Sequence, residues 1–465
     1  MSDIAAPTAP TGAPADLPAD PRLRYVAIGV AAAAAAVAYF LHRAGMPRAG
    51  AASGVVFFIA LVASFSPNLR LVNWRTVGWG FALQVLLALF ILKLEIGGVR
   101  PGYALFSAIG NMVKKFLEFT NAGSEFVFGP LANPGTMERG LEVGPGGGFI
   151  FAFTALPTII FVSSFFTVLY YMGILQLIVR LMAKGMMKLM QTSGAETLSA
   201  AANVFMGQTE APIIVKPYVP SMTQSELLAM MVGGMATISG GVMAVYIAMG
   251  ADPIAILTTS VMAAPCGLYL SKILLPETEE PLTRGEVKLQ VERQHVNVID
   301  AAAGGASDGT ILAINVAAML IAFLAFIALF DGILGFIGGS FGRPDLDLAQ
   351  IFSWVFAPVA ILMGVPSKDI FAMGDLLGTK LVANEFVAYV KLTGTYRDVV
   401  DPRTYTLATF ALTGFANLGS IGIQLGGIGG MAPSRRGDLA RLGARCLLAG
   451  FVATLVNASI ASIFL

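Results

Sequence analysis

The chain has 465 residues, of which 56% are hydrophobic and only 12% are charged. Soluble domains carry about 25% charged residues, so a soluble protein of this composition would lack the polar residues needed to cover its surface. The 29 basic and 28 acidic residues give a net charge of +1, which excludes the strongly basic surface typical of nucleic-acid-binding proteins. The composition therefore predicts an all-α polytopic membrane protein with no nucleic-acid partner.

The N-terminal part of the chain divides into a polar tail and an apolar stretch. Residues 1–21 are rich in Ala, Pro and Asp and lack apolar periodicity, so we expect a disordered tail. An alanine-rich stretch follows at about 25–42. Arg22 and Arg24 before it are also typical of a signal peptide, but no convincing cleavage site follows. We therefore expect residues 22–50 to form an extra N-terminal transmembrane helix.

Further hydrophobic stretches approach the roughly 20 residues that cross a bilayer as a helix, which gives about nine transmembrane helices in all. These stretches lie at about 51–67, 77–95, 148–172, 226–250, 254–274, 309–331, 404–425 and 439–464. Lys and Arg cluster in loops that the positive-inside rule places in the cytoplasm with the N-terminus. These loops lie near residues 70–75, 180–188, 272–293 and 435–436. Arg43 and Arg48 fall on the opposite side, whereas 96–147 is expected to be external, with an interfacial helix at 103–118.

Two apolar segments contain too many helix-breaking residues to be simple spans. The first is 193–218, with Gly207 and Pro212, and the second is 366–391, with Gly378. Non-helical backbone survives at membrane depth only where it is buried in protein or lines a cavity. We therefore expect each segment to form a re-entrant hairpin that enters and leaves the membrane on the same side.

Each predicted hairpin is followed by a span with a polar break. The first break is Thr237-Ile238-Ser239-Gly240, and the second is Asn417-Leu418-Gly419-Ser420. One hairpin starts from the cytoplasmic side and the other from the external side. Such an order, occurring twice in opposite orientations, indicates an inverted repeat with its site near the middle of the membrane.

The first hairpin carries an isolated carboxylate in the sequence Gly207-Gln208-Thr209-Glu210-Ala211-Pro212. At this depth a Glu is costly unless it is neutralised, hydrogen-bonded or faces a cavity. Gln208 and Thr209 add donors and acceptors beside Glu210, which predicts a small-molecule site. The alternative is a polar tip that only caps its own backbone.

The second half carries a matching set of polar residues. The two oxygens of Glu385 suit the adjacent hydroxyls of a sugar, because a carboxylate accepts several hydrogen bonds. The alternative is an ion pair with a nearby lysine, Lys380 or Lys391. Asn417 and Ser420 are three residues apart and share a helix face, and the preceding Phe415 could stack on a planar ring. An Asn/Ser pair in a membrane helix is also a common interhelical contact.

Uncharged oxygen atoms near the first hairpin and the first break predict a cation site. Asn203 and Thr237 would supply side-chain oxygens, and Met206 and Ile238 would supply freed backbone carbonyls. Such hard, neutral ligands fit a monovalent cation. The two cysteines and two histidines have no partners at ligand spacing, so no other metal site is expected.

Several motifs, in order along the chain, resemble those of the concentrative nucleoside transporters. Besides the first-hairpin sequence, they are Gly234-Met235-Ala236-Thr237-Ile238-Ser239-Gly240-Gly241-Val242, Asn297-Val298-Ile299-Asp300-Ala301-Ala302, Ala383-Asn384-Glu385-Phe386-Val387-Ala388-Tyr389, Gly414-Phe415-Ala416-Asn417-Leu418 and Ala432-Pro433-Ser434-Arg435-Arg436-Gly437-Asp438. The resemblance covers roughly 51–465. It implies two inverted-repeat halves that form a mobile transport domain, a scaffold domain, and a homotrimer in the bacterial cytoplasmic membrane.

The resemblance also implies a role for each candidate residue. The residues facing the nucleobase would be Gln208, Thr209 and Glu210, with Val242 packing on it. The residues holding the ribose would be Glu385, Asn417 and Ser420, with Phe415 beside them. The sodium ligands would be Asn203, Thr237 and the carbonyl groups of Met206 and Ile238.

The domain organisation follows from the same resemblance. Beyond the tail and the extra helix, its parts are scaffold spans and interfacial helices (51–192), the first transport-domain repeat (193–275), a cytoplasmic loop with a long scaffold span and an external interfacial helix (276–365), and the second transport-domain repeat (366–465). Each repeat comprises a hairpin and a broken span, and the second also contains the last helix.

We therefore predict a secondary transporter, not an enzyme, that imports nucleosides with sodium and needs no organic cofactor. A proton-coupled symporter is the alternative, with Glu210 or Glu385 as the proton carrier, because burial favours a protonated carboxyl group. An intramembrane hydrolase is disfavoured, since Ser239-Gly240 and Gly374-Asp375 have no His or second Asp at a usable spacing. A channel is disfavoured because conduction does not need a charged, sugar-sized pocket. The sequence leaves purine or pyrimidine preference open.

Overall fold

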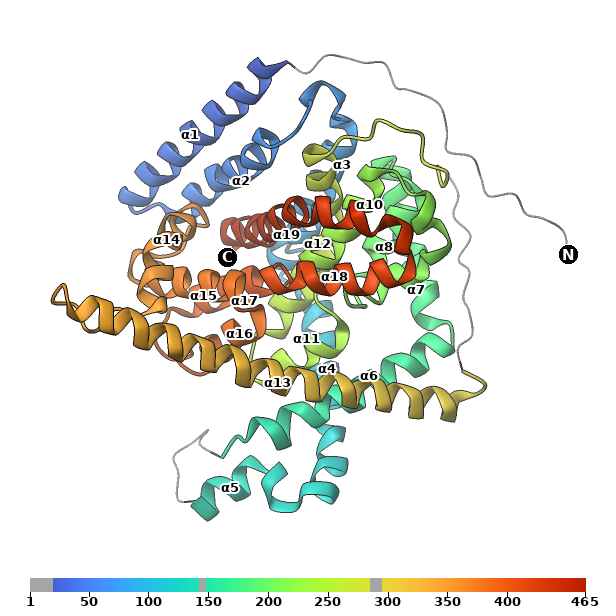
Figure 1. Ribbon diagram of the computed structural model, residues 1–465, viewed down its shortest axis with the longest axis vertical. Helices are drawn as coiled ribbons and strands as arrows, with labels where there is room; N and C mark the ends of the chain where they lie inside the picture. The colour runs from blue at the N-terminus through green and yellow to red at the C-terminus, as the bar shows by residue number, and fades with distance from the viewer. Residues whose placement is uncertain (1–19, 142–147, 285–294) are drawn as a thin grey trace, which may run out of the picture.

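The computed structural model describes residues 20–141, 148–284 and 295–465 (Figure 1). Within these ranges the protein is all-α, and the single β-bridge pairs Ile96 with Val99. The predicted tail lies outside the described residues except for Asp20 and Pro21. Pro21 already begins the first helix, because the Asp20 side chain caps it by accepting a hydrogen bond from the Arg22 backbone N–H at 3.0 Å.

Two antiparallel helices form one edge of the molecule, and a third follows them (Figure 1). The elements of this region are α1 (Pro21–Arg43), α2 (Pro47–Ser64), η1 (Leu69–Leu71), α3 (Trp74–Ala88) and η2 (Leu89–Lys93). The Asn73 side chain caps α3 by accepting a hydrogen bond from the Arg75 N–H at 3.1 Å. Helix α1 therefore covers the alanine-rich stretch predicted at 25–42, but it is shorter than the helix expected over 22–50, because it ends at Arg43 and α2 begins at Pro47. The physical reason is the turn at Gly45, whose φ of +76° lies outside helical geometry.

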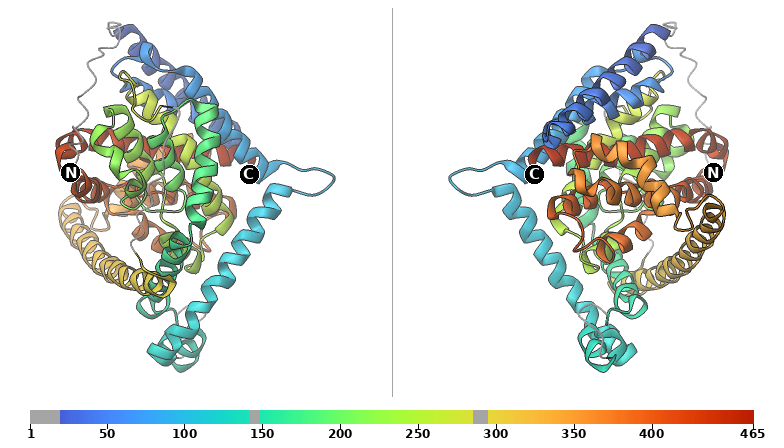
Figure 2. Two further views of the ribbon diagram at one scale, coloured as in Figure 1. Left: turned by 90° about the vertical axis from the view of Figure 1, so that its right-hand side faces the viewer. Right: turned by 90° about the vertical axis from the view of Figure 1, so that its left-hand side faces the viewer.

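Residues 101–190 form the next group of helices. Its elements are α4 (Pro101–Phe128), η3 (Gly129–Ala132), α5 (Pro134–Leu141), α6 (Phe151–Tyr171) and α7 (Ile174–Met190). The helix predicted at 103–118 is part of the longer α4, which runs along the outer edge of the molecule (Figure 2).

A long helix separates the two halves of the chain. Helix α13 (Val298–Gly339) has 42 residues, extends well beyond the apolar stretch predicted at 309–331, and packs along α6. It is followed by α14 (Leu348–Leu362), which packs against the second half.

Two sets of five α-helices, each preceded or interrupted by short 3-10 helices, lie near the centre of the molecule. The first set comprises α8 (Gly194–Ala202), α9 (Ala211–Ile214), η4 (Lys216–Ser221), α10 (Gln224–Ala236), α11 (Gly240–Ala248) and α12 (Pro253–Leu274). The second set comprises η5 (Ser367–Asp369), α15 (Ile370–Val382), α16 (Glu385–Thr393), α17 (Pro402–Leu412), α18 (Leu418–Met431), η6 (Pro433–Arg435) and α19 (Arg436–Phe464). Helix α10 packs against α19, and α12 packs against α17, so the two sets interlock.

Eight helices of the described ranges are long and apolar enough to cross a membrane. The stretch predicted at 404–425 is not among them, because residues 413–417 separate α17 from α18. The second break therefore begins earlier than the predicted Asn417–Ser420. The physical reason is a helix cap: the Asn417 side chain accepts a hydrogen bond from the Ser420 N–H at 2.9 Å, so helical structure restarts at Leu418.

Buried polar side chains join α3, α12 and α19. Gln84 donates through Nε2 to Asn457 Oδ1 at 2.6 Å and accepts at Oε1 from the Tyr269 hydroxyl at 2.8 Å. Asn457 in turn donates through Nδ2 to Thr259 Oγ1 at 3.2 Å. Such interhelical hydrogen bonds are the usual way to join helices in an apolar environment, where hydrophobic burial provides little attraction.

A buried ionic cluster holds the starting ends of α8 and α10 together. Lys272 Nζ, at the end of α12, lies 2.6 Å from Glu196 Oε2 in the first turn of α8. Ser193, which caps α8, donates to Glu226 Oε1 in α10 at 2.5 Å. These contacts fix the base of the first repeated set and thereby orient the irregular segment that follows α8.

Candidate functional site

The irregular segment of the first set, residues 203–210, is called the first tip and joins α8 to α9 without helical structure. Glu210 Oε2 accepts a hydrogen bond from the Gly207 N–H at 2.9 Å. The carboxylate therefore does cap the backbone of its own tip, as the alternative to a small-molecule site predicted. Glu210 is nevertheless exposed, and it lines a cavity of about 620 Å³ together with Met206 and Ser239. The carboxylate therefore both orders the tip and borders an open space large enough for a small molecule.

The two helix breaks contact each other. The first break is residues 237–239, and the second is residues 413–417. The Phe415 N–H in the second break donates to the Thr237 carbonyl in the first at 3.1 Å, and the Gly240 N–H donates to a carbonyl of the first tip at 2.9 Å. Gly414 has φ +139°, and a Cβ there would lie 3.0 Å from two carbonyl oxygens of α10, so the close approach requires glycine.

Glu385 begins α16 directly after Asn384, whose side chain caps the helix. The Glu385 side chain is buried, and both of its oxygens accept hydrogen bonds. Asn417 Nδ2 donates to Oε2 at 2.8 Å, and the Tyr246 hydroxyl donates to Oε1 at 3.2 Å. An ionised carboxylate has about four acceptor positions, so about two remain for the hydroxyl groups of a ligand.

The two lysines considered as ionic partners of this carboxylate have other partners. Lys391 Nζ lies 2.7 Å from Asp375 Oδ1. Lys380, which is fully buried, donates to the Ala411 carbonyl at 2.7 Å and to Thr454 Oγ1 at 2.9 Å. The structure therefore does not support the ion-pair alternative for Glu385.

A chain of hydrogen bonds links the two repeated sets. Gln208 Nε2 in the first tip donates to Ser420 Oγ in α18 at 3.2 Å, and Ser420 is bonded through its backbone to Asn417. Asn417 donates to Glu385, which also accepts a hydrogen bond from Tyr246. The sequence pattern does not reveal Tyr246, and the only available signal is a hydroxyl in an apolar helix, which needs a partner when buried.

The remaining candidate residues lie around this chain without joining it. Thr209 packs on α18, where a Cβ added to Gly427 would lie 2.5 Å from Thr209 Cγ2. Val242 is buried in the first turn of α11, where its N–H donates to Ser239 Oγ at 3.4 Å. Phe415 is half-buried in the second break.

The oxygen atoms proposed for a cation come from the first tip and the first break. The fully buried Asn203 approaches Gly233, where an added Cβ would lie 3.1 Å from Asn203 Nδ2. The Thr237 hydroxyl donates to the Gly233 carbonyl at 2.9 Å, so both side chains reach the same turn of α10. Among the described residues, Asn203 Oδ1 has no hydrogen-bond partner. The backbone carbonyls considered with them belong to Met206 in the tip and Ile238 in the break.

Three family models match consecutive parts of the chain. They are described as "Na+ dependent nucleoside transporter N-terminus" at residues 53–131, "Nucleoside recognition" at 152–253 and "Na+ dependent nucleoside transporter C-terminus" at 255–462.

Similar proteins include transporters from bacteria and mammals. An "Uncharacterized transporter" from Haemophilus influenzae is 44% identical over 417 residues, which cover 89% of this chain and 96% of that protein. "Sodium/nucleoside cotransporter 1" from Homo sapiens is 39% identical over 427 residues, which cover 88% of this chain but 63% of that protein. This chain thus spans less than two thirds of the human protein.

Solved structures with the same fold include two states of the protein CNTnw. The structure in an inward-facing substrate-bound state is 42% identical, with a TM-score of 0.82, covering 90% of this chain and 98% of that chain. A variant in an outward-facing state is 41% identical, with a TM-score of 0.85, covering 90% of this chain and 99% of that chain.

Proposed function

Since the chain belongs to the Na+-dependent nucleoside transporter family, and is thus a multi-pass membrane protein that transports nucleosides, we propose that it imports them by sodium symport. The resemblance inferred from the motifs and the all-α fold are confirmed by these comparisons. The family is one of transporters, so the protein is not an enzyme.

The observation that carries the proposal of sodium coupling is the unbonded Oδ1 of Asn203. It is a neutral oxygen in the fully buried part of the described structure, beside a break where backbone carbonyls leave helical geometry. A buried polar atom without a partner is costly unless a ligand satisfies it. In this proposal Asn203, Thr237 and the carbonyls of Met206 and Ile238 hold the sodium ion as a co-transported substrate.

The nucleoside site of this proposal lies beside the cation site. The residues assigned to the base are Gln208, Thr209, Glu210 and Val242, and those assigned to the ribose are Glu385, Asn417, Ser420 and Phe415. The hydrogen-bond chain from the first tip to Glu385 supports this arrangement, because it sets base-side and ribose-side residues at a fixed separation. The first tip also contacts the end of the first break through the Gly240 N–H, so in this proposal cation binding at the break orders the substrate site.

One sodium ion supplies enough free energy for accumulation. Moving one positive charge down ~100 mV yields about 2.3 kcal/mol. A roughly tenfold sodium gradient adds about 1.4 kcal/mol. The sum of ~3.7 kcal/mol supports an accumulation of several hundredfold for a neutral solute.

Uptake into proteoliposomes tests the coupling ion. With an inward sodium gradient at equal pH on both sides, we expect accumulation of uridine or adenosine. Thr237→Val should raise the sodium concentration that gives half-maximal uptake, with transport largely restored at saturating sodium. Thr237→Ser keeps the hydroxyl and serves as the matched control. Uptake that ignores sodium but follows an imposed pH gradient would refute sodium coupling and favour Glu210 or Glu385 as a proton carrier.

We also propose the domain organisation that the family resemblance implies. The sets within 193–275 and 366–465 would move together as the transport domain, because they interlock through α10, α12, α17 and α19. Residues 51–192 and 276–365 would form the scaffold, and the segment 22–50 would contribute the extra helix α1. We also propose a homotrimer in the cytoplasmic membrane, and light scattering of the purified protein gives the subunit number.

A further inference from the structure

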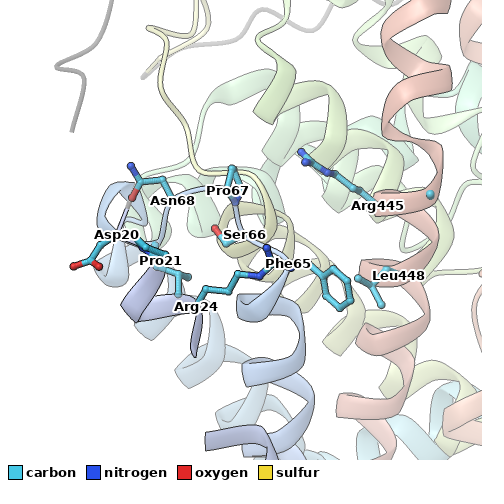
Figure 3. Close-up of a pocket in the computed structure, with 11 residues that line it drawn as sticks. Asp20, Pro21, Arg24, Phe65, Ser66, Pro67, Asn68, Arg445 and Leu448 are labelled. Carbon is cyan, nitrogen blue, oxygen red and sulfur yellow. The ribbon is translucent and has the colours of Figure 1, made fainter. Parts of the chain in front are cut away.

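A second cavity shares no lining residue with the site assigned to transport. It measures about 680 Å³ and is formed by the start of α1, the loop after α2 and the first half of α19 (Figure 3). Its lining includes Arg24, Phe65, Asn68, Arg445 and Leu448. No lining residue belongs to the first tip, the second break or the hydrogen-bond chain described above.

The charge in this cavity is predominantly positive. Arg24 extends from α1 and Arg445 extends from α19, and they enter the space from opposite sides (Figure 3). Both are exposed, and neither makes a hydrogen bond or an ion pair with any described residue. The acidic residue of the lining, Asp20, is neutralised by Arg70, whose Nη2 lies 2.6 Å from Asp20 Oδ2. The two unpaired guanidinium groups are therefore free for an anion.

The walls of the cavity combine this charge with apolar surface. Phe65 is 50% exposed at the end of α2, and Leu448 lies one turn beyond Arg445 on α19. Guanidinium groups bind phosphate with paired, charge-assisted hydrogen bonds, whereas the ring and the leucine suit hydrocarbon. A ligand with a phosphate group joined to an acyl chain matches both parts.

The sequence places the three segments that line this cavity at one side of the membrane. The positive-inside rule assigns the start of α1, the loop with Arg70 and the start of α19 to the cytoplasm, and the structure brings these three segments around one cavity. Anionic phospholipids give the cytoplasmic leaflet a negative surface potential that attracts basic residues. The cavity therefore faces the leaflet that contains the matching ligand.

Helix α1 is a feature that the transport function does not explain. The family models begin at residue 53, whereas α1 ends at Arg43. It supplies Arg24 and the capped N-terminus beside it, so the cavity depends on an element outside the family core. A ligand bridging Arg24 and Arg445 would fasten α1 to α19, which belongs to the second repeated set.

We propose that this cavity binds the phosphate headgroup of an acidic phospholipid between Arg24 and Arg445 and that the lipid fastens α1 to the body of the protein. The acyl chains leave along Phe65 and Leu448. This site is independent of the nucleoside and sodium sites, so it stands even if the proposed coupling ion is wrong.

Lipid binding to the full-length protein in detergent tests the proposal. Native mass spectrometry and thermal unfolding are measured with phosphatidylglycerol, with phosphatidylcholine and with inorganic phosphate alone. We expect phosphatidylglycerol to bind and raise the melting temperature more than phosphatidylcholine does. The double variant Arg24→Gln with Arg445→Gln should lose that preference, with an affinity loss of roughly tenfold for each arginine. Arg22→Gln, which changes an exposed arginine of α1 outside the lining, should leave it unchanged.

Several outcomes would overturn the assignment. Equal binding of the two lipids by the wild-type protein contradicts selectivity for an acidic phospholipid, because phosphatidylcholine carries the same phosphate group with a compensating positive charge. An unchanged preference in the double variant contradicts a binding site between the arginines. Stabilisation by inorganic phosphate equal to that by phosphatidylglycerol shows a soluble anion site instead of a lipid site. Should the glutamine variant fail to fold, Arg24→Lys with Arg445→Lys keeps both charges but loses the paired hydrogen bonds. It should retain phosphatidylglycerol preference at reduced affinity, and complete retention contradicts the proposed geometry.

Discussion

Replacing Gly427 by Ala tests whether the first tip must lie directly on α18. A Cβ at Gly427 would lie 2.5 Å from Thr209 Cγ2 and 3.0 Å from Thr209 Cβ. Thr209 is short and β-branched, so its side chain cannot rotate freely away from the added methyl group. We therefore expect the contact to be relieved by a shift between α18 and the tip, which also carries Gln208 and Glu210.

The expected size of the effect follows from overpacking. Inserting a methyl group into a packed contact costs about 1–3 kcal/mol. If this cost falls on the substrate-binding arrangement, nucleoside affinity should fall by roughly 5- to 150-fold. Gly426 provides a matched control in the same helix, since an added Cβ there has no atom within 4 Å. Gly→Ala in a helix is otherwise favourable by about 1 kcal/mol, so Gly426→Ala should be neutral or slightly stabilising.

Calorimetric titration of each purified variant with uridine and adenosine gives the affinities, and thermal unfolding gives the stabilities. We expect Gly427→Ala to weaken nucleoside binding while its helical content stays normal, and Gly426→Ala to bind as the wild type does. Equal affinities for the two variants would refute the packing of the first tip on α18 as a determinant of binding.

Four further substitutions probe the rest of the site and the packing around it. Glu385→Gln removes a charge-assisted acceptor worth roughly 1.5–3 kcal/mol, so the affinity for uridine should fall about ten- to hundredfold. The affinity for deoxynucleosides should fall less, and an equal loss of affinity for both substrate classes would contradict the assignment of Glu385 to the sugar. In competition binding, Gln208→Ala should change the ratio of purine to pyrimidine affinity, whereas Val242→Ala should shift that ratio by no more than about 1–3 kcal/mol. If both variants weaken every nucleoside by the same factor, the base is held elsewhere. Lys380→Met leaves the Ala411 carbonyl without its buried donor, so the melting temperature should drop by the equivalent of about 1–3 kcal/mol; an unchanged midpoint would show that this bond does not stabilise the fold.

The sequence by itself determined the class of protein and most of its elements. Interrupted segments and polar breaks depend on local residue order. Together with the apolar composition, they predicted the all-α fold and the repeated arrangement. Gly207 and Pro212 marked the interruption of the first segment, and Gly378 marked that of the second. Such caps and breaks are readable because each depends on residues only a few positions apart.

Tertiary structure alone decided the partners of these residues. The hydrogen bond from Tyr246 to Glu385 and the separate partners of Lys380 and Lys391 depend on which helices meet. Hydropathy and spacing carry no such information, because Lys380 and Lys391 are both near Glu385 along the chain, whereas its actual partner Tyr246 is 139 residues away. The shared cavity of Arg24 and Arg445 has the same origin: helix packing places two residues from opposite ends of the sequence in the lining of one cavity.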